Sequence, residues 1–202
     1  TKKTFPFEYP SGATPPDPNE TEGLIPDYIS TQGELNRLEQ ENILEARAQI
    51  IGGRHKDLMT DTFVRDLHKR MFKNVWRWAG TYRKSDNSIG VAWTQVPVQL
   101  VKLLQDTEFW IKNGTYPWPE LGVRFHHRLV LVHPFPNGNG RHARLMTDIL
   151  LEAHGQSIFT WGASLAQKDG LDTVGEARME YITALKEADE RKYARLIQFV
   201  QS

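Results

Sequence analysis

The sequence predicts a mainly α-helical domain with one small β-hairpin and an irregular, proline-rich N-terminal arm. Apolar residues recur at helical spacing through most of the chain beyond residue 30. Turn-forming residues gather between short β-prone pieces at 79–92. Six of the eleven prolines lie among the first 26 residues, where a fixed φ and a missing N–H oppose both helix and central strand.

Length and composition favour a single globular domain. The chain has 202 residues, of which 39% are hydrophobic and 25% charged, so it has room for one domain with a sizeable core but not for two full domains. We therefore expect an arm at 1–29 and one domain at 30–202. The 25 basic and 25 acidic side chains balance, and this balance predicts that neither nucleic acid nor an acidic membrane is a partner.

The chain contains no cysteine, which excludes disulfides, thiolate catalysis and cysteine-based metal sites. Its apolar runs fall far short of the roughly 20 residues that span a bilayer. The first ten residues, TKKTFPFEYP, lack the apolar core of a signal peptide. A cytoplasmic location is the resulting expectation.

The first two helices are expected at 30–52 and 61–72. The first carries apolar residues at helical spacing and ends at Gly52 and Gly53, which are natural C-cap residues. Asp61 can cap the second, whose apolar residues follow an i, i+1, i+4, i+5 pattern and so bury one stripe.

Residues 79–92 interrupt the helical pattern and predict the hairpin. Their centre, Ser-Asp-Asn-Ser at 85–88, consists of turn-forming residues. Helical spacing then resumes, and further helices are expected at 96–113, 117–132, 141–155, 173–187 and 190–200.

The most informative stretch is His-Pro-Phe-Pro-Asn-Gly-Asn-Gly-Arg-His-Ala-Arg at 133–144. Gly138 and Gly140 allow φ > 0 and can turn successive N–H groups toward one point, and the positive end of the following helix adds to them. Arg141 and Arg144 stand three residues apart on that helix, so they share a face and can bind phosphate oxygens. The pattern predicts a polyphosphate site.

His133 stands at the mouth of this loop and is a candidate general base, because histidine can accept a proton near neutral pH. A buried polar contact is the alternative role for a lone histidine. A hairpin turn and a dinucleotide-binding fingerprint fit the loop less well, since helical periodicity follows it and no second parallel strand is in view. A metal site of His126, His127 and His133 is disfavoured, because adjacent helical residues point about 100° apart.

These twelve residues resemble the signature of the Fic family, His-Pro-Phe-x-Asp/Glu-Gly-Asn-Gly-Arg-x-x-Arg. The resemblance extends from about Glu34 to Phe199 and includes LHKRMF-x-x-VWRWAG-x-YR before the expected hairpin. It implies a Fic-type helical bundle and looks closest to the subfamily called mobile mystery protein B. Proteins with this motif transfer AMP from ATP to a hydroxyl of a target protein, so the resemblance implies a protein adenylyltransferase (AMPylase) that uses ATP and Mg²⁺.

The resemblance also assigns roles to single residues. His133 would deprotonate the target hydroxyl, and Phe135 would anchor the loop in the core. Arg141 would contact the β-phosphate side, and Arg144 would orient the γ-phosphate. The full set expected at the nucleotide phosphates is Asn137, Gly138, Asn139, Gly140, Arg141 and Arg144.

Asn137 departs from the signature, which has an acidic Mg²⁺ ligand at that position. An amide oxygen can still ligate a hard cation but brings no negative charge, so the affinity for Mg²⁺ should fall. We expect the nucleotide phosphates to hold Mg²⁺ with Asn137 assisting. A weakly active or inactive nucleotide-binding module of the toxin–antitoxin type is the alternative.

In this family the hairpin, here 83–91, would be a flap that aligns the target by strand-like pairing. The expected docking residues are Arg83, Ser88, Ile89 and Gly90; an ordinary surface hairpin is the alternative.

Many members also carry a self-inhibiting helix whose glutamate pairs with the second motif arginine. The segment 30–35 matches this helix in part and selects Glu34, with Glu41 as second choice. A helix-opening acid that interacts with the helix dipole is the alternative role of Glu34.

The expected partners are ATP and a protein with a Ser, Thr or Tyr hydroxyl. A cognate antitoxin-like partner and a homodimer are both left open. A Fic-fold transferase that uses another phosphate-containing donor is the second enzymatic alternative.

Overall fold

The computed structural model describes residues 23–53, 55, 57–166, 171 and 175–202, and this part of the chain is mainly helical. The elements are α2 (Gln32–Ile50), α3 (Asp61–Phe72), the 3₁₀ turn η1 (Trp93–Gln95), α4 (Val96–Asn113), α5 (Trp118–Val132), α6 (Asn139–Ala153), α7 (Ala163–Ala166), α8 (Glu176–Asp189) and α9 (Ala194–Val200). The prediction of a mainly α-helical fold is confirmed.

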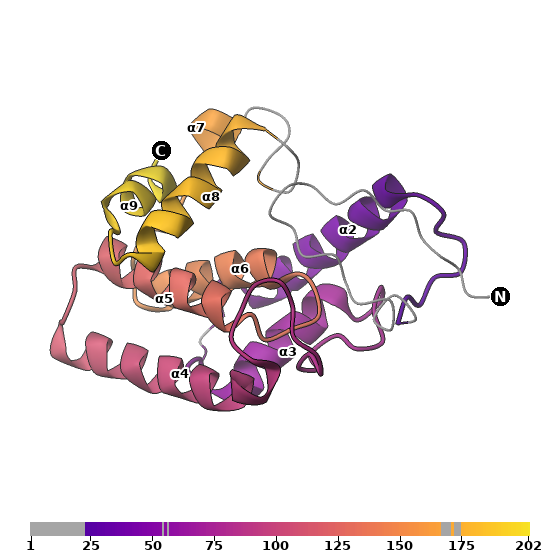
Figure 1. Ribbon diagram of the computed structural model, residues 1–202, viewed down its shortest axis with the longest axis horizontal. Coiled ribbons are helices and arrows are strands. Elements are labelled where there is room, and N and C mark those ends of the chain that lie inside the picture. Colours follow the sequence, from indigo (N-terminus) through magenta and orange to yellow (C-terminus); the bar gives the residue numbers. More distant parts are fainter. Residues whose placement is uncertain (1–22, 54, 56, 167–170, 172–174) are drawn as a thin grey trace.

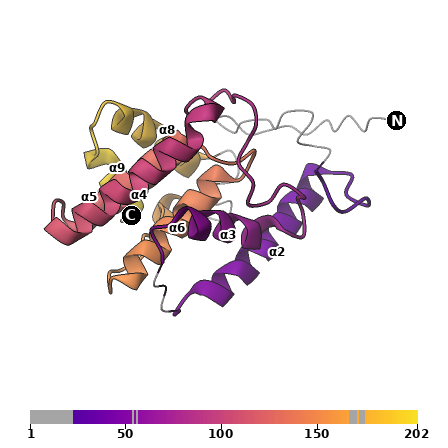
Figure 2. The ribbon, with the colours of Figure 1, turned by 90° about the horizontal axis from the view of Figure 1, so that it is seen from below.

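Helices α5 and α6, joined by the loop 133–138, lie at the centre of the molecule (Figure 1). Helix α4 packs along α5, α3 packs against α6, and α2 packs against α3. Figure 2 shows α2 and α3 together on one side of α6. At the other end, α9 packs on α5 and α8 on α9.

Two clusters of buried apolar side chains hold these layers together. The larger lies among helices α2 to α6 and includes Val64, Leu100, Phe125 and Met146, all with 0% exposure. The smaller lies beneath α8 and α9 and includes Ala184, Leu196 and Val200. Because α5 and α6 contribute to both clusters, the loop between these two helices is fixed at its two ends.

Predicted helix ends agree best where a local cap specifies them. Helix α4 ends at Gly114 in the left-handed conformation (φ 58°), as expected of a C-cap glycine. The N-cap of α3 is Thr60, whose Oγ1 accepts the Phe63 N–H at 3.2 Å. The prediction that Asp61 caps this helix is therefore wrong by one residue, because the threonine hydroxyl occupies the cap and Asp61 begins the helix.

The predicted hairpin at 79–92 is not observed: within the described chain no strand occurs, and the β-bridge found there joins Leu24 to Trp76. The physical reason is Arg83, whose guanidinium lies inside the segment and donates to the carbonyls of Ser85 and Val91. Carbonyls that a strand ladder would use are thus bonded by a side chain, and the segment forms bends and turns.

Most of the predicted arm at 1–29 lies outside the described residues, which begin at Gly23. Its last part runs beside the segment after α3: the Ile25 N–H donates to the Val75 carbonyl and the Arg77 N–H to that of Gly23, each at 2.8 Å. Among the helices that the structure describes, none combines the length and the apolar character needed to cross a bilayer.

Candidate active site

His133 is the C-cap residue of α5 and adopts a left-handed conformation (φ 50°, ψ 59°), which is uncommon for a residue with a Cβ. Its Nδ1 lies 3.3 Å from the Val130 carbonyl oxygen. A carbonyl only accepts hydrogen bonds, so Nδ1 carries the proton in this contact and Nε2 has the free lone pair. The helix end thus fixes the tautomer in which Nε2 can act as a base.

Burial lowers the pKa of His133 to about 4, and the nearby positive charge of Arg83 acts in the same direction. The residue is 7% exposed. Because the free imidazole is the form that accepts a proton, His133 is in its working state at neutral pH without further adjustment.

The loop after His133 ends in a helix start, as predicted, but α6 begins at Asn139 rather than at 141, so Gly140 lies inside the helix and does not adopt a positive φ. Gly138 is the N-cap of α6 with φ 77°, and no side chain caps this helix in the described structure. In any α-helix the first N–H groups have no partner within the helix, and here no side-chain cap accepts from them either. The positive end of the helix dipole lies at the same place. A Cβ on Gly138 would lie 2.5 Å from Phe72 Cζ, so this position requires glycine.

Asn139 braces the loop from within. It is 3% exposed, its Oδ1 accepts the Phe135 N–H at 2.9 Å, and its Nδ2 donates to the Phe135 carbonyl at 2.8 Å. Phe135 itself is fully buried. Both polar atoms of the Asn139 side chain thus bond within the loop, so only the main-chain N–H of Asn139 remains for the expected contact with phosphate.

Asn137, the expected Mg²⁺ contact, has its Oδ1 2.7 Å from the Gly138 N–H, from which it accepts a hydrogen bond. Mg²⁺ prefers carboxylate and water oxygens in a near-octahedral set. Among the described residues, no group of three or more His, Cys, Asp or Glu side chains is placed to hold a metal ion. The Asn137 oxygen thus already has a partner, and the described His, Asp and Glu side chains add no cluster of ligands to it.

The two arginines of the motif lie on α6, and each is partly exposed. Arg141 donates from Nη1 to Glu39 Oε2 at 2.8 Å. The guanidinium carbon of Arg144 lies 6.0 Å from the centre of the Tyr181 ring on α8. The structure thus places both arginines on the helix that begins at the phosphate loop, each with a contact to another layer.

The segment 79–92 lies directly against His133. Arg83 donates from its main-chain N–H to the Pro134 carbonyl at 3.0 Å and from Nε to the His133 carbonyl at 2.7 Å. A Cβ on Gly90, whose φ is 112°, would lie 2.7 Å from His133 Cβ. Ser88, Ile89 and Gly90 are exposed, as expected of docking residues, whereas Arg83 is 1% exposed and cannot be part of a docking surface.

The predicted inhibitory residue, Glu34, is part of a capping box at the start of α2. Its Oε2 accepts the N–H groups of Ser30 and Thr31 at 2.9 and 3.1 Å, and these bonds lower its pKa. Its described contacts are those of a helix cap rather than of an acid paired with Arg144. Glu41, the second choice, is exposed on the same helix.

His68 also supports the loop, a role that no local sequence pattern indicates. The Gly80 N–H donates to His68 Nδ1, so Nε2 carries the proton and donates to the Asn137 carbonyl, both at 3.0 Å. Its ring stacks on Phe135 with centroids 3.8 Å apart. Burial lowers the pKa of His68 well below its usual value, with His142 acting in the same direction, so the neutral ring joins the segment 79–92 to the motif loop.

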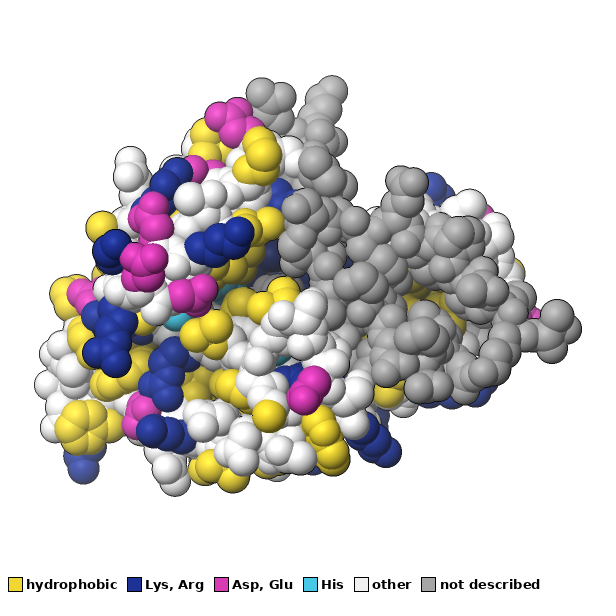
Figure 3. All heavy atoms as spheres, in the orientation of Figure 1, with side chains coloured by type: hydrophobic (Ala, Val, Ile, Leu, Met, Phe, Trp, Pro, Cys, Tyr) yellow, Lys and Arg dark blue, Asp and Glu magenta, His cyan; other side chains and the backbone are white. Residues whose placement is uncertain are grey.

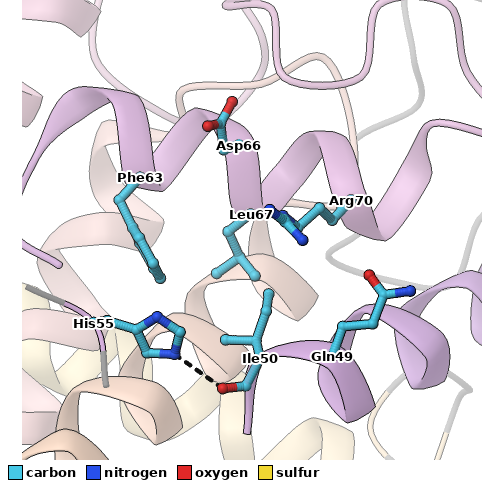
Figure 4. A pocket seen from close by; sticks show the side chains of 7 residues that line it. All are labelled: Gln49, Ile50, His55, Phe63, Asp66, Leu67 and Arg70. Carbon is cyan, nitrogen blue, oxygen red and sulfur yellow. Dashed lines mark hydrogen bonds between the residues drawn. The ribbon is translucent and has the colours of Figure 1, made fainter. Parts of the chain in front are cut away.

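A separate cavity of about 170 Å³ lies between the end of α2 and α3 (Figure 4). It is lined by Gln49, Ile50, His55, Phe63, Asp66, Leu67 and Arg70. His55 Nε2 lies 2.9 Å from the Ile50 carbonyl oxygen across its floor. None of these lining residues belongs to the motif at 133–144, so this cavity is not part of the candidate site.

On the face shown in Figure 3, basic, acidic and apolar side chains are interspersed over the described elements, and histidine appears only as small areas. This distribution agrees with the burial of His68, His126, His133 and His142 in the interior.

Comparison with protein families and curated proteins identifies what the chain is similar to. Residues 58–151 match the family described as Fic/DOC. A probable protein adenylyltransferase of Aquifex aeolicus is 29% identical over 126 residues, which cover 59% of this chain and 35% of that protein. Protein adenylyltransferase fic-1 of Caenorhabditis elegans is 28% identical over 110 residues, 52% of this chain and 22% of that protein. The chain thus spans about a third or less of the length of these relatives.

Solved structures share the fold at lower identity. The N-terminal Fic domain of a putative cell filamentation protein of Bartonella quintana has a TM-score of 0.66 and 18% identity, covering 90% of this chain and 92% of that one. BepC of Bartonella tribocorum, with bound AMPPNP, has a TM-score of 0.65 and 16% identity, covering 86% and 87%. The Fic-type helical fold is therefore confirmed, whereas the resemblance to one subfamily stays a prediction.

Proposed function

We propose that this chain, whose residues 58–151 form a domain of the Fic/DOC family, is a protein adenylyltransferase that moves AMP from ATP to a Ser, Thr or Tyr hydroxyl of a target protein. One observation carries the proposal: a histidine with a free Nε2 lone pair stands at the entry of a loop that ends in an uncapped helix start with two arginines. The relatives named protein adenylyltransferase support it.

The chemistry requires a base and neutralisation of charge. His133 Nε2 would take the proton of the target hydroxyl, and the hydroxyl oxygen would form a bond to the α-phosphorus of ATP. The bond from that phosphorus to the bridging oxygen would break, and pyrophosphate would leave. The N–H groups at the start of α6, Arg141 and Arg144 would stabilise the charge on the leaving phosphates.

Mg²⁺ would arrive with the nucleotide as part of the substrate. Since Asn137 brings no charge and its Oδ1 already accepts the Gly138 N–H, the phosphates would supply most of the ligands. Asn137→Asp should therefore lower the Mg²⁺ concentration needed for half-maximal activity. Labelling that is independent of Mg²⁺ in both proteins would contradict this assignment.

The target would dock on the exposed residues Ser88, Ile89 and Gly90 of the segment 79–92. The close approach of Gly90 to His133 supports this place, because a main chain laid along the segment would bring a hydroxyl near the imidazole. An antitoxin-like partner, a homodimer and a cytoplasmic location remain predictions, as does autoinhibition by Glu34 or Glu41.

A nucleotide-binding module with little turnover is the second candidate, and the amide at position 137 in place of an acid favours it. Incubation of a cell lysate with the protein and ATP labelled separately at the α- and γ-phosphates separates the functions. Adenylyl transfer predicts α-label on protein, phosphoryl transfer predicts γ-label, and a binding module predicts neither.

His133→Ala provides the control, because loss of a general base lowers rates by about 10²–10⁴-fold. The matched variant is His154→Ala, since His154 is exposed at the far end of α6, where its Nδ1 lies 2.8 Å from the Leu150 carbonyl oxygen and its ring packs against that of Trp118. Equal α-labelling by both variants would contradict the role of His133.

A further inference from the structure

Glu39 on α2 is a buried acid, with 2% of its surface exposed, which is a rare environment for a glutamate. Each carboxylate oxygen accepts a hydrogen bond. Oε1 accepts from Trp76 Nε1 at 2.7 Å, and Oε2 accepts from Arg141 Nη1 at 2.8 Å. The acid is thus partnered on both oxygens and links α2 to the first turn of α6.

Arg141 is held from two directions. Besides the bond to Glu39, its guanidinium carbon lies 5.1 Å from the centre of the Phe72 ring, within the range of a cation–π interaction. The same ring lies against Gly138 of the phosphate loop. Phe72 therefore supports both the loop and the arginine, and Glu39 sets the direction of the guanidinium.

We propose that Glu39 is a positioning residue for phosphate recognition: its carboxylate, held by Trp76, fixes the Arg141 guanidinium beside the start of α6 so that the remaining N–H groups meet a nucleotide phosphate. The inference rests on the proposed function, which makes this loop the nucleotide site. The proposal concerns Arg141, the first arginine of the motif, and it gives Glu39 a role that favours nucleotide binding rather than one that inhibits it.

The contacts favour positioning over obstruction. A guanidinium has five N–H donors in a rigid fork, and the described bond to Glu39 uses one of them. The Glu39 side chain is 3% exposed and also bonded to Trp76. An entering phosphate that displaced Glu39 from Arg141 would leave a buried carboxylate without its ionic partner, which is costly.

Glu39→Gln tests the contact with little change of shape. Glutamine has one acceptor oxygen and an NH₂ donor, whereas both neighbours, Trp76 Nε1 and Arg141 Nη1, are donors. At least one of the two bonds must therefore be lost, together with the ionic partner of Arg141. Glu45→Gln is the matched control, because Glu45 is exposed on the same helix and accepts from Gln49 at 3.1 Å.

The first measurement needs no nucleotide. Nuclear magnetic resonance of the free protein at low temperature should resolve the Nη–H signals of Arg141 in the wild type and in Glu45→Gln, because the ion pair slows rotation of the guanidinium. In Glu39→Gln these signals should average. Identical Arg141 signals in all three proteins would overturn the proposal.

The second measurement is calorimetric titration with AMPPNP. Glu39→Gln should raise the Kd by about tenfold, the order expected for a lost charged hydrogen bond, and Glu45→Gln should leave it within about twofold. In an Arg141→Lys background the same change should add less than about twofold, because Glu39 acts through the guanidinium fork. An unchanged Kd in Glu39→Gln, or a lower one, would overturn positioning.

The two measurements also separate the two proposals. If the wild type takes up no AMPPNP, the proposed function fails, and inorganic pyrophosphate then serves as the probe of the same loop. Arg141 signals that are resolved in the wild type and averaged in Glu39→Gln, together with a weaker uptake of pyrophosphate by Glu39→Gln, would still support positioning. If Glu39→Gln changes neither the Arg141 Nη–H signals nor the uptake of pyrophosphate, the positioning role of Glu39 is wrong, whichever reaction the protein catalyses.

Discussion

The loop 133–138 and the segment 79–92 lie against each other at the same site, but different causes determine their conformations. The loop is specified by neighbours in sequence: Asn139 bonds both main-chain groups of Phe135, and Gly138 starts the helix. The segment is specified by one buried guanidinium, that of Arg83, which bonds carbonyls on both sides of the contact. Local patterns can be recognised in a sequence, whereas the burial of a long charged side chain cannot be predicted from its neighbours in the chain.

The largest expected effect comes from removing that guanidinium. Arg83→Met keeps much of the side-chain volume but leaves the carbonyls of Ser85, Val91 and His133 without their donor. The free energy of unfolding should fall by about 3–5 kcal/mol. Urea denaturation measures it, with the exposed neighbour change Lys84→Met as control, expected within about 0.5 kcal/mol. Equal stability of the two variants would show that Arg83 does not hold the segment.

The corresponding change in the loop should cost somewhat less. Asn139→Ala leaves the N–H and the carbonyl of buried Phe135 unpaired, at a cost of about 2–3 kcal/mol. Asn113→Ala is the matched control, because Asn113 makes a similar bond to the Phe109 carbonyl at 2.8 Å but is exposed. A loss for Asn139→Ala no larger than for Asn113→Ala would mean that the loop does not depend on its internal brace.

The same contrast explains what the sequence could predict. Helical periodicity, the end of the helix at 113 and the loop hinged at Gly138 are local features, and they were predicted correctly, whereas Gly140 lies within α6 rather than in the loop. The hairpin, and Arg83 as a docking residue, were wrong, because turn-forming residues at 85–88 look alike whether a strand ladder or a buried side chain holds them. The bond of Glu39 to Arg141 joins residues 102 positions apart, and no local pattern encodes such a pair.

The contact between the two regions can be tested at Gly90. Gly90→Ala places a Cβ 2.7 Å from His133 Cβ at a φ of 112°, so the segment must shift; we expect a loss of about 1 kcal/mol in stability. Under the proposed function, α-label transfer should fall by about tenfold, since small displacements of a base are costly. Gly33→Ala is the control, because an added Cβ there meets open space within α2.

Gly33→Ala should leave labelling unchanged and raise stability slightly, by up to about 1 kcal/mol, as alanine favours a helix more than glycine does. If Gly90→Ala retains full labelling, the close approach of the segment to His133 has no part in the reaction, and the docking role of residues 88–90 loses its support.

The smallest expected effect is an absence of pH dependence where an ordinary histidine would produce one. Burial, with Arg83 nearby, lowers the pKa of His133 to about 4. The neutral form is the base, so at pH 5.5 nearly all of His133 is still active, whereas a histidine with the usual pKa of about 6.5 would be neutral in only about a tenth of molecules. The rate of α-label transfer, corrected for ATP uptake measured at the same pH, should change less than about twofold between pH 7.5 and 5.5.

Because Arg83 contributes to this lowered pKa, the two regions are coupled electrostatically as well as sterically. Arg83→Met removes a positive charge beside the imidazole, so the pKa of His133 should rise. The pH at which the rate of α-label transfer falls on acidification should rise with it, but by less than the shift that burial causes, because burial is the larger of the two effects. A fall of the wild-type rate near pH 6.5 would mean that His133 is hydrated in solution and that the segment does not cover it. If the pH dependence of label transfer is the same in Arg83→Met and in the wild type, burial alone lowers the pKa of His133. The segment 79–92 would then influence His133 only through packing.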